Sequence, residues 1–243
     1  MRRTSPMKIV FLMSDNAGTA GRHELLNHHP DEYGAILGPT LIELQQPAYR
    51  ARQIAGWVHE RFAAGFNAMT DLPADLRTRL DERFSVSPLE MAFQARSRDG
   101  TVKHLWRLRD GEQVESVLIP SRERVTLCLS SQAGCALACR FCATGDFGFR
   151  RQLSAAEIVA QFRDAELVSR HVFGRGIANV VYMGMGEPMA NLDAVLESLS
   201  ILHGGFGFGA RRITVSTVGL VPGIRALAAR PEPFRLAVSL HAP

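Results

Sequence analysis

All four cysteines of the chain, Cys128, Cys135, Cys139 and Cys142, fall within fifteen consecutive residues. Such crowding in a chain without a signal-peptide pattern indicates metal or redox chemistry rather than a disulfide framework. The last three, spaced C-x-x-x-C-x-x-C, can bind three irons of a [4Fe-4S] cluster and leave the fourth iron open to a chelating ligand. A zinc ion would need a fourth ligand, for which Cys128 is the candidate. Buried, inert thiols are the third interpretation.

A second motif, Gly184-Met-Gly-Glu-Pro188, directly follows an apolar run that predicts a strand over 177–183. Its glycines would let the backbone approach a ligand closely, and Glu187 could accept hydrogen bonds from an ammonium group. The third glycine of the dinucleotide-binding pattern is missing. By itself the motif also fits a simple glycine turn at the end of a strand.

The composition is that of a folded globular protein with a basic surface. The 243 residues are 46% hydrophobic, the net charge is +4, and only two of the 28 cationic side chains are lysine. Arginine suits bidentate contacts with phosphate, so RNA is a candidate partner, although codon composition can also enrich arginine. The basic residues that occur in pairs near expected loops or helix starts are Arg50, Arg52, Arg122, Arg124, Arg150, Arg151, Arg211 and Arg212.

No apolar run approaches the roughly 18 to 20 residues of a membrane-spanning helix. The short run Ile9 to Met13 also falls short of the apolar core of a signal peptide. We therefore expect a cytoplasmic protein with no membrane partner.

The elements that must position these motifs fall into four segments. Residues 1–40 mix histidine, glycine and proline without periodicity and predict an irregular lead-in. Residues 41–88 carry apolar residues at helical spacing and predict a small helical domain. Residues 89–120 predict a β-hairpin, with Asp110-Gly111 at its turn.

Residues 121–243 alternate apolar runs with helical periods in the order βαβαβαβ. The expected strands are 125–130, 177–183, 212–217 and 235–240, and the expected helices are 154–173, 192–203 and 222–229. Repeated βα units predict an α/β fold with a parallel sheet, whose functional loops lie at the carboxyl ends of the strands. Four strands are too few for a closed barrel, so we expect a partial (βα) barrel that is incomplete at the C terminus.

The cysteine motif with an aromatic before its last cysteine, Cys135-Ala-Leu-Ala-Cys139-Arg-Phe-Cys142, resembles the signature of the radical S-adenosylmethionine (SAM) superfamily. The wider strings resemble one family within it, the RlmN dual-specificity RNA methyltransferases, of which Cfr is a close relative. These strings are Leu127-Cys128-Leu-Ser-Ser-Gln-Ala-Gly-Cys135, Gly184-Met-Gly-Glu-Pro188, Val215-Ser-Thr217 and Ser239-Leu-His-Ala242. Tyr49-Arg-Ala-Arg-Gln-Ile54 and Met69-Thr-Asp-Leu-Pro73 resemble the helical N-terminal domain of that family.

The resemblance implies a radical SAM barrel preceded by an RNA-contacting helical domain. It implies methylation of adenosine carbon 2 in 23S rRNA and in tRNA, with a [4Fe-4S] cluster and SAM as cofactors. A flavodoxin or ferredoxin type of electron donor and a monomeric state are expected. The alternatives are Cfr-like methylation of carbon 8, a radical SAM enzyme with another substrate, and a metal-stabilised RNA-binding fragment without turnover.

The resemblance also implies roles for single residues. Cys135, Cys139 and Cys142 would bind the cluster, and the residues that would contact SAM are Gly186, Glu187, Ser216, Ser239, Leu240 and His241. Cys128 matches the cysteine that resolves a protein–RNA link by forming a disulfide, and Glu115 matches the proton acceptor. On pattern alone, Cys128 is a small apolar residue of a strand and Glu115 a solvent-facing residue of a hairpin.

The sequence departs from the family at one point. The family carries the transferred methyl group on a second cysteine near the C terminus, and no cysteine follows Cys142 in these 243 residues. We therefore expect binding of the cluster and SAM, but no complete RNA methylation by this chain alone.

Overall fold

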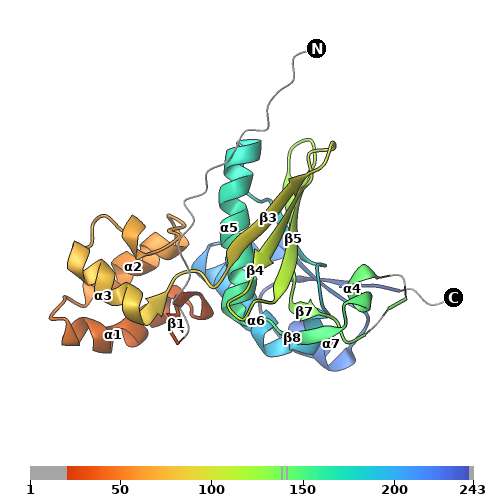
Figure 1. Ribbon diagram of the computed structural model, residues 1–243. Coiled ribbons are helices and arrows are strands. Elements are labelled where there is room, and N and C mark those ends of the chain that lie inside the picture. The colour runs from red at the N-terminus through yellow and green to blue at the C-terminus, as the bar shows by residue number, and fades with distance from the viewer. Residues whose placement is uncertain (1–20, 138, 141, 241–243) are drawn as a thin grey trace, which may run out of the picture.

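The structure is a computed structural model that describes residues 21–240 except 138 and 141. A helical unit lies beside an α/β body built on a seven-stranded sheet (Figure 1). The helices are α1 (Tyr33–Glu43), α2 (Tyr49–His59), α3 (Ala74–Arg83), α4 (Ala143–Asp146), α5 (Ala155–Phe173), α6 (Leu192–Ser200) and α7 (Val221–Ala228). The strands are β1 (His23–Glu24), β2 (Phe84–Ser85), β3 (Glu90–Arg96), β4 (Val102–Arg107), β5 (Gln113–Pro120), β6 (Val125–Cys128), β7 (Gln132–Gly134), β8 (Phe149–Gln152), β9 (Asn179–Tyr182), β10 (Ile213–Thr217) and β11 (Arg235–Val238).

The helical unit begins earlier in the chain than the sequence predicted. The expected irregular lead-in over 1–40 is wrong for residues 33–40, which form most of α1, while residues 1–20 lie outside the described part of the chain. Pro39 lies within α1, where proline normally weakens a helix by removing one backbone hydrogen bond. Tyr33, Leu37 and Leu41 recur every four residues and are buried, so tertiary packing outweighs this local cost.

The sheet has the order β11-β10-β9-β6-β5-β4-β3. Its first part is an antiparallel meander, in which β4 pairs with both β3 and β5. The predicted hairpin is present as β4 and β5, with Gly111 in the turn at φ +89°. The prediction missed β3, because only Met91, Ala92, Phe93 and Ala95 are apolar there and the strand lies half-exposed at the sheet edge.

The second part of the sheet is parallel, with β6, β9, β10 and β11 as successive neighbours. α5, α6 and α7 connect these strands in turn, which confirms the predicted βαβαβαβ order and the partial-barrel class. Because parallel strands end on the same side of a sheet, the segments that follow β6, β9, β10 and β11 meet at one edge.

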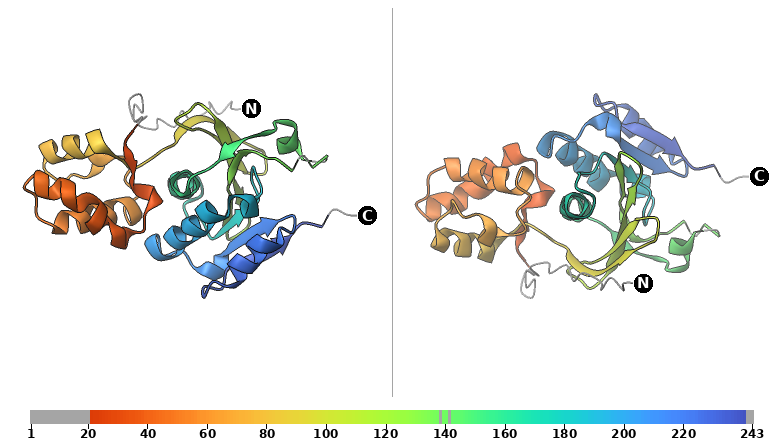
Figure 2. Two further views of the ribbon diagram at one scale, coloured as in Figure 1. Left: turned by 90° about the horizontal axis from the view of Figure 1, so that it is seen from below. Right: turned by 90° about the horizontal axis from the view of Figure 1, so that it is seen from above.

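α5 lies between the sheet and the helical unit, as the end-on views show (Figure 2). Ser154 and Glu157 cap its first turn reciprocally, and Gly174 ends it in the left-handed conformation at φ +66°. Arg163 on α5 is buried and donates to the carbonyl oxygens of Ala63 (3.2 Å) and Val86 (2.9 Å), which ties the helical unit to the body. In the described part of the chain no helix is long and apolar enough to span a bilayer.

Candidate functional site

Three of the predicted site residues share one face of the sheet. Cys128 on β6 is in register with Val117 on β5 and with Val181 on β9, and Val181 is in register with Thr214 on β10. Side chains two residues apart on a strand point to the same side, so Glu115 and Ser216 join Cys128 on this face. The opposite face carries the buried residues that pack in the core, including Leu118 and Leu127.

The three cysteines of the motif sit on a loop that a small hairpin closes. β7 precedes the loop and β8 follows it, and the two strands pair antiparallel. The amide of Cys135 donates to the carbonyl oxygen of Gly148 at 3.1 Å, and a side chain on Gly134 would overlap that oxygen. The sequence predicted neither strand, because three and four residues are too few for a periodic signal.

The donor set of this loop fits an iron–sulfur cluster in its chemistry. Cys135, Cys139 and Cys142 are free thiols and partly exposed, and the amide of Cys142 donates to the carbonyl oxygen of Cys139 at 3.0 Å in a tight turn. Among the described residues, no group of three or more His, Cys, Asp and Glu side chains is arranged to hold a metal ion. The three thiols lie on one loop, between β7 and β8.

The predicted glycine motif is hydrogen-bonded to residues 130–132, which end the loop after β6 and begin β7. The amides of Ser131 and Gln132 donate to the carbonyl oxygen of Met185 at 2.9 and 3.2 Å, and the amide of Met185 donates to Ser130 Oγ at 2.8 Å. Gly186 has φ +96°, and a Cβ there would lie 2.5 Å from Gln132 Cβ. Glycine is therefore required at this position by both conformation and space.

Glu187 is buried and its carboxylate joins two loops. Oε1 accepts from the Met189 amide at 3.0 Å and Oε2 accepts from the Val218 amide, also at 3.0 Å, while the Glu187 amide donates to Gln132 Oε1 at 2.7 Å. The side chain thus links the loop after β9 to the loop after β10. Each carboxylate oxygen can accept a further hydrogen bond, so this arrangement still allows contact with an ammonium group.

Four polar side chains that the sequence analysis did not single out hold this edge of the sheet together. Gln132 donates to Gln152 (2.8 Å), which donates to the carbonyl oxygen of Ala190 (2.7 Å). Asn191 donates to the carbonyl oxygens of Ser131 and Leu153, and Gln161 both accepts from and donates to the Ser130 backbone. Only Gln132 lies inside a quoted motif, and amide residues scattered along a chain have no local signal.

Cys128 ends β6 with its thiol in an apolar environment. Burial raises the pKa of this thiol to about 11, although a hydrogen bond from the Met183 backbone partly offsets the effect. The thiol therefore carries its proton at neutral pH and needs a base before it can act as a nucleophile.

The structure describes all but one of the remaining predicted residues. The Glu115 carboxylate is half-exposed and paired with the Lys103 ammonium group at 3.2 Å. The backbone carbonyl oxygen of Glu115 accepts a hydrogen bond from Ser130 Oγ at 2.6 Å. Ser216 Oγ lies 3.3 Å from Ser239 Oγ, which places these two residues together. Leu240 is exposed, and His241 lies outside the described residues.

Two of the arginines suggested for RNA contact have intramolecular partners. Arg151 is held by Glu157 and Asp110, and Arg50 donates to Gln53 (2.7 Å) and to the carbonyl oxygen of Asp71 (3.1 Å). Pairs of arginines in a sequence do not reveal such contacts, because the partners come from other elements.

Comparison with known proteins follows the same division of the chain. Residues 37–86 match the family described as the ribosomal RNA large subunit methyltransferase N-terminal domain, and residues 129–243 match the radical SAM superfamily. A solved structure, a radical SAM methyltransferase from Sphaerobacter thermophilus, superposes with a TM-score of 0.85 at 45% identity, covering 91% of this chain and 64% of that one.

Curated relatives cover most of the chain. The probable dual-specificity RNA methyltransferase RlmN of Gemmatimonas aurantiaca is 48% identical over 222 residues, which are 90% of this chain and 61% of the relative. The dual-specificity RNA methyltransferase RlmN of Geobacter sulfurreducens is 53% identical over 196 residues, which are 80% of this chain and 52% of the relative. The chain thus spans less than two thirds of the length of these relatives. Its two family matches, its motifs and this level of identity show that the chain belongs to the RlmN family of radical SAM proteins.

Proposed function

We propose that the chain carries the cluster-binding and SAM-binding part of an RNA methyltransferase that acts on adenosine carbon 2 in 23S rRNA and in tRNA. One observation carries the proposal. The cysteine hairpin and the glycine loop, which lie far apart in the sequence, are bonded to each other through Ser130, Ser131 and Gln132 at the carboxyl edge of the sheet. The names of the relatives supply the substrate class.

In this proposal Cys135, Cys139 and Cys142 hold a [4Fe-4S] cluster. The residues that would hold SAM are Gly186, Glu187, Ser216, Ser239, Leu240 and His241. When bound, the two cofactors supply the one-electron chemistry that makes a carbon radical, and the protein orients them.

The chain's own residues would handle protons. Glu115 presents a carboxylate on the face that also carries Cys128, so it is the candidate to accept a proton from the substrate. The Lys103 ammonium group holds this carboxylate in place. Cys128 keeps a proton on Sγ until a base removes it, and its place on this face suits the proposed role in a disulfide.

The proposal is tested by anaerobic reconstitution of the chain with iron and sulfide, followed by metal analysis and low-temperature EPR with and without SAM. We expect about four irons per chain and a spectrum that SAM perturbs. Replacing Cys135, Cys139 or Cys142 by alanine should abolish iron binding.

Cys128→Ala is the matched control, because it removes a thiol of the same segment that the cluster does not need. Iron content should stay at the wild-type level in this variant. A chain that takes up zinc instead, and loses it on Cys128→Ala, would establish a four-cysteine zinc site and exclude the cluster.

The substrate class is tested separately by binding. Transfer RNA and a 23S rRNA fragment should bind the chain with an affinity that falls as salt rises, since arginine–phosphate contacts release counterions. Equal affinity for an unrelated single-stranded RNA at physiological salt would leave the RNA specificity unsupported while leaving the cluster result intact.

A further inference from the structure

The cysteine loop is attached to the body by a hairpin that cannot be stable alone. β7 has three residues and β8 has four, and the register shifts between Ala133 and Gly134. A two-stranded ribbon of this length has marginal stability in water. Contacts from outside the hairpin must therefore fix the position of the loop that carries Cys135, Cys139 and Cys142.

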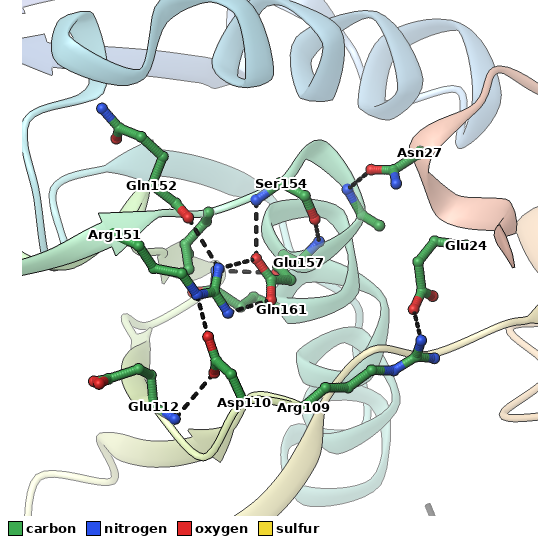
Figure 3. A network of polar contacts seen from close by, with 12 residues as sticks. Glu24, Asn27, Arg109, Asp110, Glu112, Arg151, Gln152, Ser154, Glu157 and Gln161 are labelled. Atoms are coloured by element: carbon green, nitrogen blue, oxygen red, sulfur yellow. Dashed lines mark hydrogen bonds and ion pairs between the residues drawn. The ribbon is translucent and has the colours of Figure 1, made fainter. Parts of the chain in front are cut away.

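Arg151 on β8 makes the charged contacts of this kind (Figure 3). Its two terminal nitrogens, Nη1 and Nη2, each donate to one oxygen of the Glu157 carboxylate at 2.8 Å, which is a bidentate pair. Its Nε donates to the carboxylate of Asp110. One guanidinium group thus joins the hairpin to α5 and to the turn between β4 and β5.

Several hydrogen bonds fix the position of the Glu157 side chain. It is nearly buried, and its Oε2 also accepts from the Ser154 amide at 2.9 Å in the capping box of α5. The Ser154 hydroxyl accepts from the Glu157 amide at 3.2 Å, and Asn27 Oδ1 accepts from the Ala156 amide at 2.7 Å. The first turn of α5 is therefore held from both sides of its axis, as Figure 3 shows.

The second partner, Asp110, lies in a tight turn. Its Oδ1 accepts from the Glu112 amide at 3.1 Å, which fixes the carboxylate relative to the start of β5. The hydrogen bond from Arg151 lowers the pKa of Asp110, so the carboxylate is ionised at neutral pH. β5 carries Glu115, five residues after Asp110, so the same guanidinium group connects the cysteine hairpin to the strand of the proposed proton acceptor.

We propose that Arg151 is a positioning residue of the cysteine loop: through Glu157 and Asp110 it holds β8, and with it the cysteines, in the place where a cluster binds. The inference rests on the proposed function, since it concerns the same cluster. Lysine can replace arginine here only in part, because a single ammonium group cannot make a bidentate pair with Glu157 and reach Asp110 as well.

The experiment measures how firmly the reconstituted 243-residue chain holds iron. Wild type, Arg151→Met, Arg151→Lys and the control Arg150→Met are reconstituted anaerobically and mixed with an iron chelator well below their melting temperatures. Arg150 is an exposed arginine of the same strand, one residue away, so its removal controls for charge. We expect iron release about tenfold faster from Arg151→Met, an intermediate rate from Arg151→Lys, and a wild-type rate from Arg150→Met.

EPR of the reduced samples supplies a readout that lost stability alone would not move. The spectrum of Arg151→Met should differ in line shape from that of wild type, because its cysteines are displaced. Equal release rates and equal spectra for wild type and Arg151→Met would overturn the inference and leave the cluster proposal standing.

Two further outcomes are distinguishable. A wild-type chain that holds no iron overturns the proposed cluster and this inference with it. If far-UV circular dichroism shows that Arg151→Met does not fold, Arg151→Lys and Asp110→Asn decide instead. Faster iron release from both supports the inference, and wild-type rates from both overturn it.

Discussion

Replacing Gly186 by alanine should damage the glycine loop far more than an ordinary glycine substitution. The new Cβ would meet Gln132 Cβ at 2.5 Å and the Gln132 amide nitrogen at 2.8 Å, and the residue would have to keep φ +96°. Both atoms belong to Gln132, the first residue of the cysteine hairpin. The loop can relieve the overlap only by moving away from that segment.

The size of the effect follows from the contacts that such a movement breaks. A non-glycine residue at positive φ costs about 1 to 2 kcal/mol. Moving the loop also breaks the hydrogen bonds from Ser131 and Gln132 to Met185 and from Glu187 to Gln132, each worth about 1 kcal/mol. The free energy of unfolding should therefore fall by about 4 to 5 kcal/mol in Gly186→Ala.

The assay is urea unfolding followed by circular dichroism, with Gly111→Ala as the control. Gly111 has a similar φ of +89°, but nothing lies within 4 Å of a Cβ built there. It should lose only the conformational part, about 1 to 2 kcal/mol. Equal losses in the two variants would refute the argument, because the close approach to Gln132 would then contribute nothing.

Two further predictions concern buried ionisable side chains, His104 and Arg163. Burial lowers the pKa of His104 from 6.5 to about 4, so the unfolded chain binds the proton more tightly than the folded chain does. The free energy of unfolding should therefore fall as pH drops from about 6.5 towards 4, by about 3 kcal/mol in total. Neither ring nitrogen has a hydrogen-bond partner among the described residues, so His104→Leu should be no less stable at pH 7 and should show a flatter pH profile; an unchanged profile would contradict this. Arg163→Met should cost about 3 to 5 kcal/mol in urea unfolding, because it leaves Asp164 and two carbonyl oxygens without their buried donor. Arg83→Met removes an arginine from an exposed ion pair with Glu43 within the helical unit and should leave the free energy of unfolding almost unchanged; similar losses in both variants would argue against the tie between the helical unit and the body.

Motifs and periodic elements were predictable because their signals are local. Ligand spacing in Cys135-x-x-x-Cys139-x-x-Cys142 depends only on neighbouring residues. The alternation of apolar runs with helical periods correctly predicted the four parallel strands and the three helices that connect them. α1 was missed for the same reason, since Gly34, Gly38 and Pro39 are local signals against a helix while its burial is not visible in the sequence.

The sequence by itself determined which residue types are available for cluster and SAM chemistry, and the α/β class that would present them. Only the tertiary structure decided that Glu115, Cys128 and Ser216 share one face, because strand register is set by packing over the whole sheet. The partners of Arg151 likewise come from other elements. Glu157 on α5 is 6 residues away in the sequence, and Asp110 in the turn after β4 is 41 residues away. An ion pair of this kind has no signal in local sequence, because its geometry exists only once the chain has folded.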